Sequence, residues 1–220
     1  MKIYLDPIST TSRPILLFLA ENDVKAEVVT VSLFAGEHKS AAHASRNPNQ
    51  AVPVLEDGDF VLTESSAILK YLAEKAGSPS YPRDLKQRAR VNQMMDWFNT
   101  GFYRDHGYGF VYAQTLPDYI YPNATTQTET LARERSRADR WLKILNDNYL
   151  EGKTFLGGEQ PSLADYMGAS YVTVGDWVGY DIAPYPNVVR WVNAMRARPS
   201  WKATHDAFNG LVAQMRAPKK

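Results

Sequence analysis

The chain has 220 residues, 44% of them hydrophobic, and its 25 basic side chains nearly balance 24 acidic ones, for a formal net charge of +1. Such a composition describes a globular protein of one or two domains, and the scattered basic residues provide no field for a nucleic-acid partner. Because there is no cysteine, the sequence excludes a disulfide framework, a cysteine nucleophile and a zinc–thiolate site.

The start of the chain, MKIYLDP, contains no apolar stretch of the length that a signal peptide needs. No apolar run elsewhere approaches the ~20 residues that cross a membrane as a helix. We therefore expect a cytoplasmic protein with no membrane partner.

Short strands and helices alternate in the first half of the chain. Lys2–Leu5 is predicted as a strand, and the hydroxyl-rich loop 6–12 leads into a helix from Ser12, where Pro14 is tolerated in the first turn. The predicted elements that follow are a β-branched strand at 26–31, a weak helical stretch at 37–45, strands at 52–55 and 60–62, and a helix after Thr63.

Val52-Pro53 is predicted to stand at the beginning of its strand, because a proline cannot donate a hydrogen bond inside a sheet. An X-Pro bond is the peptide bond for which the cis form costs little. A cis bond here would turn the backbone of Val52 outward. The residues Glu56–Asp59 then form a hairpin turn, in which Asp-Gly supplies the positive φ.

The helix after the hairpin begins near Ser65, which is a favourable N-cap residue. Its free backbone amides suit a carboxylate, and the neighbouring Glu64 suits an ammonium group. This helix start is therefore suited to binding a small zwitterion.

The order βαβαββα predicts a thioredoxin-like domain. Such a fold usually places its chemistry in the loop after the first strand, beside the cis-proline turn. Redox members carry two cysteines in that loop. This chain has Ser9, Thr10, Thr11 and Ser12 there instead.

The motifs from Val52 onward, Val-Pro-Val-Leu, Asp-Gly-Asp-Phe, Thr-Glu-Ser-Ser-Ala-Ile and Tyr-Leu, resemble the glutathione-binding half of soluble glutathione transferases. The pattern is most similar to the serine-dependent theta and delta types, bacterial members included. The resemblance is sharp over residues 3–75 and architectural beyond them.

This resemblance implies a glutathione S-transferase that joins the thiolate of its co-substrate glutathione to a small hydrophobic electrophile, such as an isothiocyanate or a halide. It also implies a homodimer and no metal. Glutathione-dependent dehalogenation is a variant of the same prediction. The alternative is a catalytically silent protein of the same fold that binds ligands or acts as a scaffold.

Ser9 is the catalytic candidate within this resemblance, because the spacing Ser-x-x-Ser-Arg is similar to the theta-type loop whose first serine bonds the glutathione sulfur. Ser12 is the better cap for the next helix. The residues alone leave open that both serines only cap that helix. A hydroxyl is chemically sufficient, since its bond to a thiolate contributes roughly 1.5–3 kcal/mol and the helix N-terminus up to about 1 kcal/mol more.

The resemblance also implies which residues bind glutathione. The set is His38, Gln50, Val52, Pro53, Glu64 and Ser65. The last two would hold the γ-glutamyl group, the backbone of Val52 would pair with the cysteinyl part, and His38 and Gln50 would approach the glycine carboxylate.

The second half of the chain is predicted to be all helical. We expect a thioredoxin-like domain at 1–77, a linker at 78–84 and an all-α domain at 85–220, because the stretch 76–82 is rich in glycine, proline and serine. Long helices are expected at 84–113 and 129–150, and shorter ones from Ser162, at 187–196 and at 201–215. Ser162 and Asp165 form a capping-box pattern.

Aromatic residues gather near the end of the first long helix and are candidates for the electrophile pocket. The candidates are Tyr103, His106, Tyr108, Phe110 and Tyr112, with Trp177 on the far side. Tyr103 and Tyr112 are the first choices for a phenol that donates to an electrophile such as an isothiocyanate. An aromatic stripe also has a structural interpretation, as part of the helical core.

Overall fold

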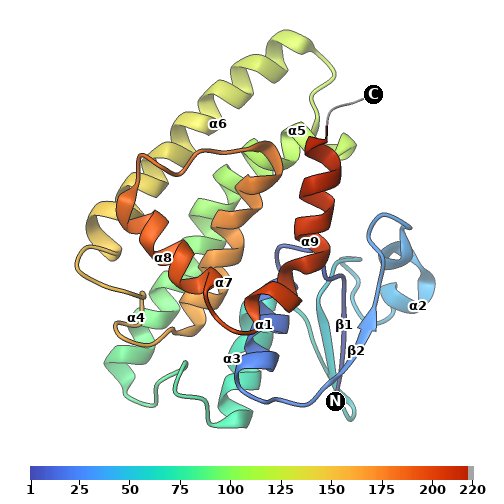
Figure 1. Cartoon of the computed structure of the whole chain (residues 1–220). Helices are drawn as coiled ribbons and strands as arrows, with labels where there is room; N and C mark the ends of the chain where they lie inside the picture. The colour runs from blue at the N-terminus through green and yellow to red at the C-terminus, as the bar shows by residue number, and fades with distance from the viewer. Residues whose placement is uncertain (218–220) are drawn as a thin grey trace.

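The structure is a computed structural model and describes residues 1–217. One mixed sheet has the order β2-β1-β3-β4, with β1 parallel to β2 and antiparallel to β3 (Figure 1). Its strands are β1 (Lys2–Leu5), β2 (Glu27–Thr30), β3 (Val54–Asp57) and β4 (Phe60–Leu62). The sheet and its helices confirm the predicted thioredoxin-like arrangement.

Three helices belong to this part of the chain, α1 (Arg13–Glu21), α2 (Ala41–Ala44) and α3 (Ser65–Ala76). Figure 1 shows α1 and α3 between the sheet and the other helices, with α2 on the far side beyond β2. The helical stretch predicted at 37–45 is divided in two, because Ser40 is extended (φ −64°, ψ 151°) and separates the 3₁₀ turn Glu37–Lys39 from α2.

The rest of the described chain is helical. Its α-helices are α4 (Leu85–Asp96), α5 (Ala113–Thr115), α6 (Ala124–Ile144), α7 (Leu163–Thr173), α8 (Pro186–Arg196) and α9 (Trp201–Arg216). Two π-helical segments, Trp97–Phe102 and Arg104–Tyr112, lie between α4 and α5, and a π-helical turn at Leu145–Tyr149 continues α6. The 3₁₀ turns are Pro117–Tyr119, after α5, and Val174–Val178, after α7. The predicted all-α architecture is confirmed for the described residues.

Helix α6 begins at Ala124, five residues before the predicted start at Glu129. The side chain of Asn123 caps it by accepting a 3.0 Å hydrogen bond from the amide of Thr126. The threonine-rich first turn has low helix propensity, so the residue pattern alone favours a later start. The cap offsets this low propensity.

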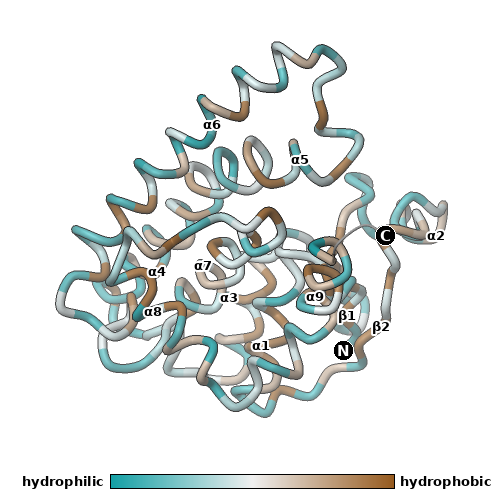
Figure 2. Tube along the Cα trace, turned by 45° about the horizontal axis from the view of Figure 1, so that its top comes forward, coloured by the Kyte–Doolittle hydropathy of each residue, from teal (hydrophilic) through white to brown (hydrophobic). Residues whose placement is uncertain are grey.

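Helix α7 is the centre of the helical layer, and all 11 of its residues are buried. The predicted capping box is present, with the amide of Ser162 donating to Asp165 at 2.8 Å. The carboxylate of Asp165 also accepts from the indole of Trp191 at 2.9 Å and from the amide of Leu156 at 2.7 Å. Figure 2 shows hydrophobic segments where α1, α3, α7 and α9 meet, whereas α6 is mostly hydrophilic.

The chain passes from the sheet to the helical layer between Gly77, which ends α3, and Asp84, which caps α4. The domain bounds 1–77 and 85–220, with the linker 78–84, stay a prediction. Within residues 1–217 no helix has the length and apolar character that a membrane crossing requires.

Candidate active site

Within the sheet domain, the loop after β1 is held in place by Asp6 and by its own backbone. The buried carboxylate of Asp6 accepts from the amide of Ile8 at 3.0 Å and from that of Leu33 at 2.8 Å. The amide of Ser9 donates to the carbonyl of Asp6 at 2.9 Å. Ser9 is thereby fixed at a turn directly before α1.

The hydroxyl of Ser9 is connected to the cis-proline turn through Thr11. Its Oγ lies 3.0 Å from Oγ1 of Thr11, which donates to the carbonyl of Val52 at 3.1 Å. The Val52–Pro53 bond is cis, as expected. Ser9 is only half-buried and lies beside this turn. No sequence pattern indicates that Thr11 connects Ser9 to Val52.

Ser12 has a different environment, because it is fully buried. It stands at the N-cap position of α1, but its side chain makes no capping hydrogen bond there. Its Oγ has no partner among the described residues. The amide of Arg13 donates a 3.1 Å hydrogen bond to the backbone carbonyl of Ser9 and not to a serine side chain. The expectation that Ser12 caps the helix through its hydroxyl is wrong.

Arg13 is the first residue of α1 and is completely buried below the Ser9 loop. Its guanidinium donates to the carbonyls of Ile8 at 3.2 Å and Ser170 at 3.1 Å, and lies 3.6 Å from the ring centre of Phe208. Burial lowers the pKa of Arg13 to about 10, which still leaves the side chain charged at neutral pH. A fixed cation therefore lies under the loop that holds Ser9.

The start of α3 departs from the prediction, since Glu64 and not Ser65 occupies the N-cap position. Glu64 is exposed and has a φ of 67°, whereas Ser65 is buried as the first helical residue. Gln50, which is also exposed, has a φ of 52°. Non-glycine residues with positive φ are strained, and such strain gathers at functional sites.

The segment before the cis-proline is held by two buried residues that the sequence analysis missed, His43 and Asn47. Both contact the carbonyl of Ala51, His43 Nε2 at 3.0 Å and Asn47 Nδ2 at 2.8 Å.

His38 lies nearby in the chain, half-buried in the 3₁₀ turn, and its pKa is lowered mainly by burial. Its imidazole is therefore neutral at neutral pH and has an N–H to donate.

Tyr112 joins the Ser9 loop to the helical layer. Its hydroxyl lies 2.8 Å from Oγ1 of Thr10 and 2.6 Å from the hydroxyl of Tyr103. Thr10, Tyr103 and Tyr112 are all buried, so this chain of hydroxyls is shielded from water. Two of the predicted pocket residues thus have their hydroxyls bonded inside the protein.

Tyr108 is the exposed member of the same aromatic group, with 43% of its surface accessible. Its ring centre lies 4.9 Å from that of Tyr103 and 5.3 Å from that of Tyr112. Burial of the group raises the pKa of Tyr108 to about 12, so the phenol is a proton donor at neutral pH. Tyr119, which is not among the predicted pocket residues, extends this aromatic group, and its ring centre lies 5.7 Å from that of Tyr108.

The π-helical backbone explains why these tyrosines share one face. Hydrogen bonds from residue i to i+5 widen the turn, so residues four and five apart, such as Tyr103, Tyr108 and Tyr112, project in similar directions. Gly107 is required by close approach, because an added Cβ would lie 2.3 Å from the Tyr103 ring. An ordinary α-helix would turn Tyr108 away from Tyr103.

His106 and Phe110 lie in the helical core, which corrects their assignment to the pocket. His106 is fully buried, with Nε2 3.3 Å from the carbonyl of Val172 and its ring centre 5.0 Å from that of Tyr180. Phe110 is buried against the same Tyr180 ring, at 5.5 Å. Trp177 lies beside the tyrosines of the predicted pocket, with its ring centre 6.3 Å from that of Tyr112.

No metal centre was expected at this site. Among residues 1–217 there is no group of three or more histidine, aspartate or glutamate side chains placed to hold a metal ion.

Comparisons with known proteins identify two family models along the chain. The model "Glutathione S-transferase, N-terminal domain" matches residues 3–74, and "Glutathione S-transferase, C-terminal domain" matches residues 110–199. Glutathione S-transferase theta-1 of Bos taurus is 40% identical over 169 residues, which cover 76% of this chain and 70% of that protein. Human theta-2 is 34% identical over 200 residues, which cover 90% and 81%.

Solved structures give the same result. Human glutathione transferase theta-2, in complex with glutathione and an unknown ligand, superposes with a TM-score of 0.87 at 31% identity, covering 97% of this chain and 89% of that one. A delta-class glutathione transferase of Nilaparvata lugens has a TM-score of 0.81 at 28% identity, covering 98% of each chain.

We predict that the buried position of His106 makes the protein sensitive to acid. Burial lowers the pKa of His106 to about 4, against about 6.5 in an unfolded chain. The folded state then binds fewer protons than the unfolded state between these pH values, so stability is complete above pH 6.5 and falls as the pH drops toward 4. The free energy of unfolding should fall by about 2.5 kcal/mol between pH 7 and 4.5 from this residue.

Urea unfolding at both pH values measures this loss in the wild type and in His106→Phe. The variant should lose about 2.5 kcal/mol less on acidification than the wild type. His205, whose pKa is lowered to about 3 by burial, continues to contribute in both proteins. Equal losses in the two proteins would contradict the prediction.

Proposed function

The chain belongs to the glutathione S-transferase family, and on that premise we propose that Ser9 bonds the sulfur of glutathione while a wall containing Tyr108 receives the electrophile. As a glutathione transferase it uses glutathione as co-substrate. The thiolate sulfur forms a bond to carbon of the electrophile. With an alkyl or aryl halide the carbon–halogen bond breaks and halide leaves, and with an isothiocyanate a carbon–nitrogen π bond opens and the nitrogen takes up a proton. The protein's part is to orient the thiolate and to favour it over the thiol.

The accessibility of Ser9 is the observation that carries the assignment. Ser12 is fully buried, so its hydroxyl does not reach a substrate. Ser9 is accessible and lies at the cis-proline turn, where the backbone of Val52 offers the cysteinyl part of glutathione a short ladder. The charge of Arg13 lies beneath this loop and favours an anion above it.

The remaining glutathione contacts follow from position. Glu64 offers a carboxylate to the γ-glutamyl ammonium, and the first turn of α3, which begins at Ser65, offers backbone amides to the γ-glutamyl carboxylate. His38 and Gln50 are proposed for the glycine carboxylate. The strained backbone at Gln50 and Glu64 supports this set, because both strained residues then face the same ligand.

The alternative of a silent binding or scaffold protein has no observation in its favour, since an accessible Ser9, an exposed Glu64 and the fixed cation all suit catalysis. The cytoplasmic location and the lack of nucleic-acid and membrane partners stay predictions.

Replacement of Ser9 by alanine should raise the pKa of the bound glutathione thiol by one to two units, at roughly 1.4 kcal/mol per unit, because the lost bond is made to the thiolate. The rate at neutral pH should fall at least tenfold. The thiolate absorbance of the glutathione complex, followed against pH, measures this effect directly.

Two variants serve as controls for Ser9→Ala. Ser12→Ala should leave the thiol pKa unchanged, since its hydroxyl has no accessible surface. Glu64→Ala should raise KM for glutathione more than it lowers kcat, because it removes a contact made equally in the ground and transition states. An unchanged thiol pKa in Ser9→Ala excludes Ser9 as the sulfur ligand.

Tyr108 replaces Tyr103 and Tyr112 as the proposed donor to the electrophile. The latter two hydroxyls bond each other and Thr10, whereas the Tyr108 ring is accessible. A phenol donates best to an electrophile that develops negative charge on addition, such as an isothiocyanate. The apolar wall around it suits a small hydrophobic molecule.

Tyr108→Phe should lower kcat on isothiocyanates by roughly ten- to a hundredfold and affect short alkyl halides much less, because only the former need a donor. Tyr81→Phe is the matched control, since Tyr81 donates to Asn92 next to the linker. A panel of isothiocyanates, aryl halides and alkyl halides gives, for each substrate, the ratio of kcat in the wild type to kcat in the variant. Full activity of Tyr108→Phe on the best isothiocyanate removes Tyr108 from this role.

The exposed edge of the sheet supports a homodimer. In β4 the side chains of Phe60 and Val61 are 45% and 44% exposed, and the ring of Phe60 packs against Tyr71 at 5.3 Å. An apolar edge strand is a liability unless it is covered. We propose that the helical layer of a second copy covers it in a two-fold dimer.

The sedimentation mass of the wild type should be twice the chain mass of 24.8 kDa. Phe60→Glu should shift it toward the single-chain mass, because a charge would be buried at the interface. Phe34→Glu is the control, since Phe34 is 64% exposed but follows β2, at the opposite edge of the sheet. A wild type that sediments as a single chain at all concentrations contradicts the dimer.

A further inference from the structure

The hydroxyl of Thr11 stands between Ser9 and the cis-proline turn and makes one contact on each side. Its Oγ1 lies 3.0 Å from Oγ of Ser9 and 3.1 Å from the carbonyl oxygen of Val52. A hydroxyl has one hydrogen to donate and two lone pairs that accept. Because a carbonyl oxygen only accepts, the hydrogen of Thr11 is the one that bonds Val52.

This use of the Thr11 hydrogen fixes the direction of the hydrogen bond at Ser9. Thr11 has no second hydrogen, so the contact between the two hydroxyls requires Ser9 to donate and Thr11 to accept. Among residues 1–217 the Ser9 hydroxyl has no other hydrogen-bond partner. In this arrangement the hydrogen of Ser9 is therefore directed at Thr11.

The role proposed for Ser9 requires a different arrangement of the same hydrogens. An anion is a stronger acceptor than a neutral hydroxyl, so Ser9 turns its hydrogen from Thr11 to the sulfur. If the Thr11 hydrogen stayed on Val52, two oxygens with no hydrogen between them would face each other at 3.0 Å. That contact is repulsive, and it becomes a hydrogen bond when Thr11 turns its hydrogen to Ser9.

The carbonyl of Val52 keeps a donor when Thr11 turns away from it. The backbone of Val52 is proposed to pair with the cysteinyl part of glutathione, whose amide N–H then donates to this carbonyl. Glutathione thus supplies the hydrogen that Thr11 withdraws. A Ser9 hydroxyl that accepts from Thr11 while it donates to sulfur is polarised, and it is the stronger donor for that reason.

We propose that Thr11 is a positioning residue with two settings, donating to Val52 in the free protein and to Ser9 when a thiolate is bound. Each hydroxyl keeps its own hydrogen and only rotates, while the thiol proton leaves to water. The exchange couples occupation of the cis-proline turn to the strength of the bond at the sulfur. This inference rests on the proposed role of Ser9 and adds a residue that acts through it.

The test compares the pKa of the bound glutathione thiol, read from thiolate absorbance against pH, in the wild type and in variants of Thr11. Valine has the shape of threonine without the hydroxyl, so Thr11→Val should raise this pKa by about half a unit, less than Ser9→Ala does. Thr11→Ser retains a hydroxyl and should restore the wild-type value. The double variant Ser9→Ala/Thr11→Val should have the thiol pKa of Ser9→Ala alone, because Thr11 acts only through Ser9.

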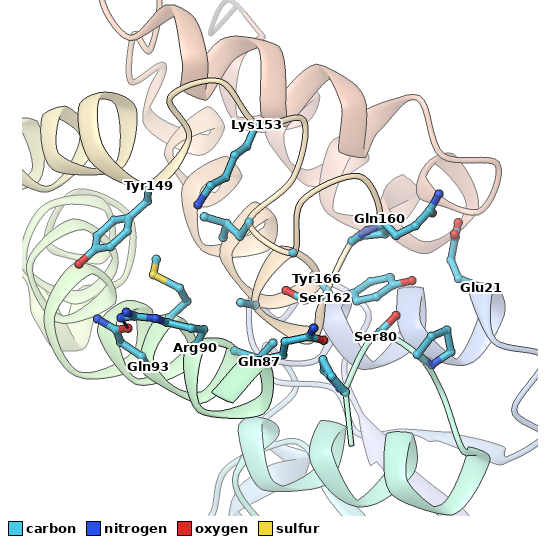
Figure 3. Close-up of a pocket in the computed structure, with 18 of the residues that line it drawn as sticks. Glu21, Ser80, Gln87, Arg90, Gln93, Tyr149, Lys153, Gln160, Ser162 and Tyr166 are labelled. Carbon is cyan, nitrogen blue, oxygen red and sulfur yellow. Dashed lines mark hydrogen bonds between the residues drawn. The ribbon is translucent and has the colours of Figure 1, made fainter. Parts of the chain in front are cut away.

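Binding of S-methylglutathione, which has no thiol to ionise, separates this role from a structural one. Thr11→Val should bind it at least as tightly as the wild type, because the Val52 carbonyl is then free for the cysteinyl amide. Ser80→Ala is the control, since Ser80 lines a cavity of about 1070 Å³ between the linker and the helical layer (Figure 3), and no residue of the Ser9 loop or the cis-proline turn lines it. This control should change neither the thiol pKa nor the affinity.

The outcomes distinguish a failure of Thr11 from a failure of Ser9. An unchanged thiol pKa in Ser9→Ala refutes the role of Ser9, and the role of Thr11 with it. A raised pKa in Ser9→Ala beside an unchanged one in Thr11→Val refutes the role of Thr11 alone. The role of Thr11 is also refuted if the two shifts add in the double variant, or if Thr11→Val binds S-methylglutathione more weakly than the wild type.

Discussion

The conformation of the Ser9 loop depends on buried contacts that cross from the sheet to the helical layer. The guanidinium of Arg13 bonds the carbonyl of Ile8 on one side and that of Ser170 on the other. Tyr112 reaches Thr10 from the π-helical segment. A buried cation without a carboxylate partner is costly, and here two carbonyls and the Phe208 ring offset the cost. The loop therefore needs the helical layer to reach its observed shape.

Short sequence motifs predict those parts of the fold that depend on interactions between residues close together in the chain. The Val52-Pro53 turn, the strands around the sheet and the capping box of Ser162 and Asp165 are short-range features, and the structure contains them. The start of α6 was predicted late because the cap of Asn123 outweighs a threonine-rich first turn. Propensity alone does not include the energy of such a cap.

The candidate pocket shows where sequence reasoning fails. Aromatic density indicated the right segment, but assignment of side chains to faces assumed an α-helical period. The π-helical hydrogen bonds of Arg104–Tyr112 change that period, so Tyr108 joins Tyr103 while His106 and Phe110 turn into the core. The bond from Thr10 to Tyr112 joins residues 102 positions apart, and no local pattern contains it.

The energetics of the thiolate explain why a serine is sufficient at this position. Each unit of pKa depression requires ~1.4 kcal/mol of preference for the anion, and a hydroxyl bond contributes roughly 1.5–3 kcal/mol. The first turn of α1 adds up to about 1 kcal/mol. Arg13, whose guanidinium donates to the carbonyl of Ile8, lies in the interior and is screened less than a surface cation. Together the hydroxyl and the helix turn would lower a thiol pKa that is ordinarily near 8.5 by roughly one to three units, which increases the thiolate fraction at neutral pH. In the role proposed for it, Ser9 has to bond the anion and not to remove the proton, a task for which a hydroxyl that stays protonated at neutral pH is suited.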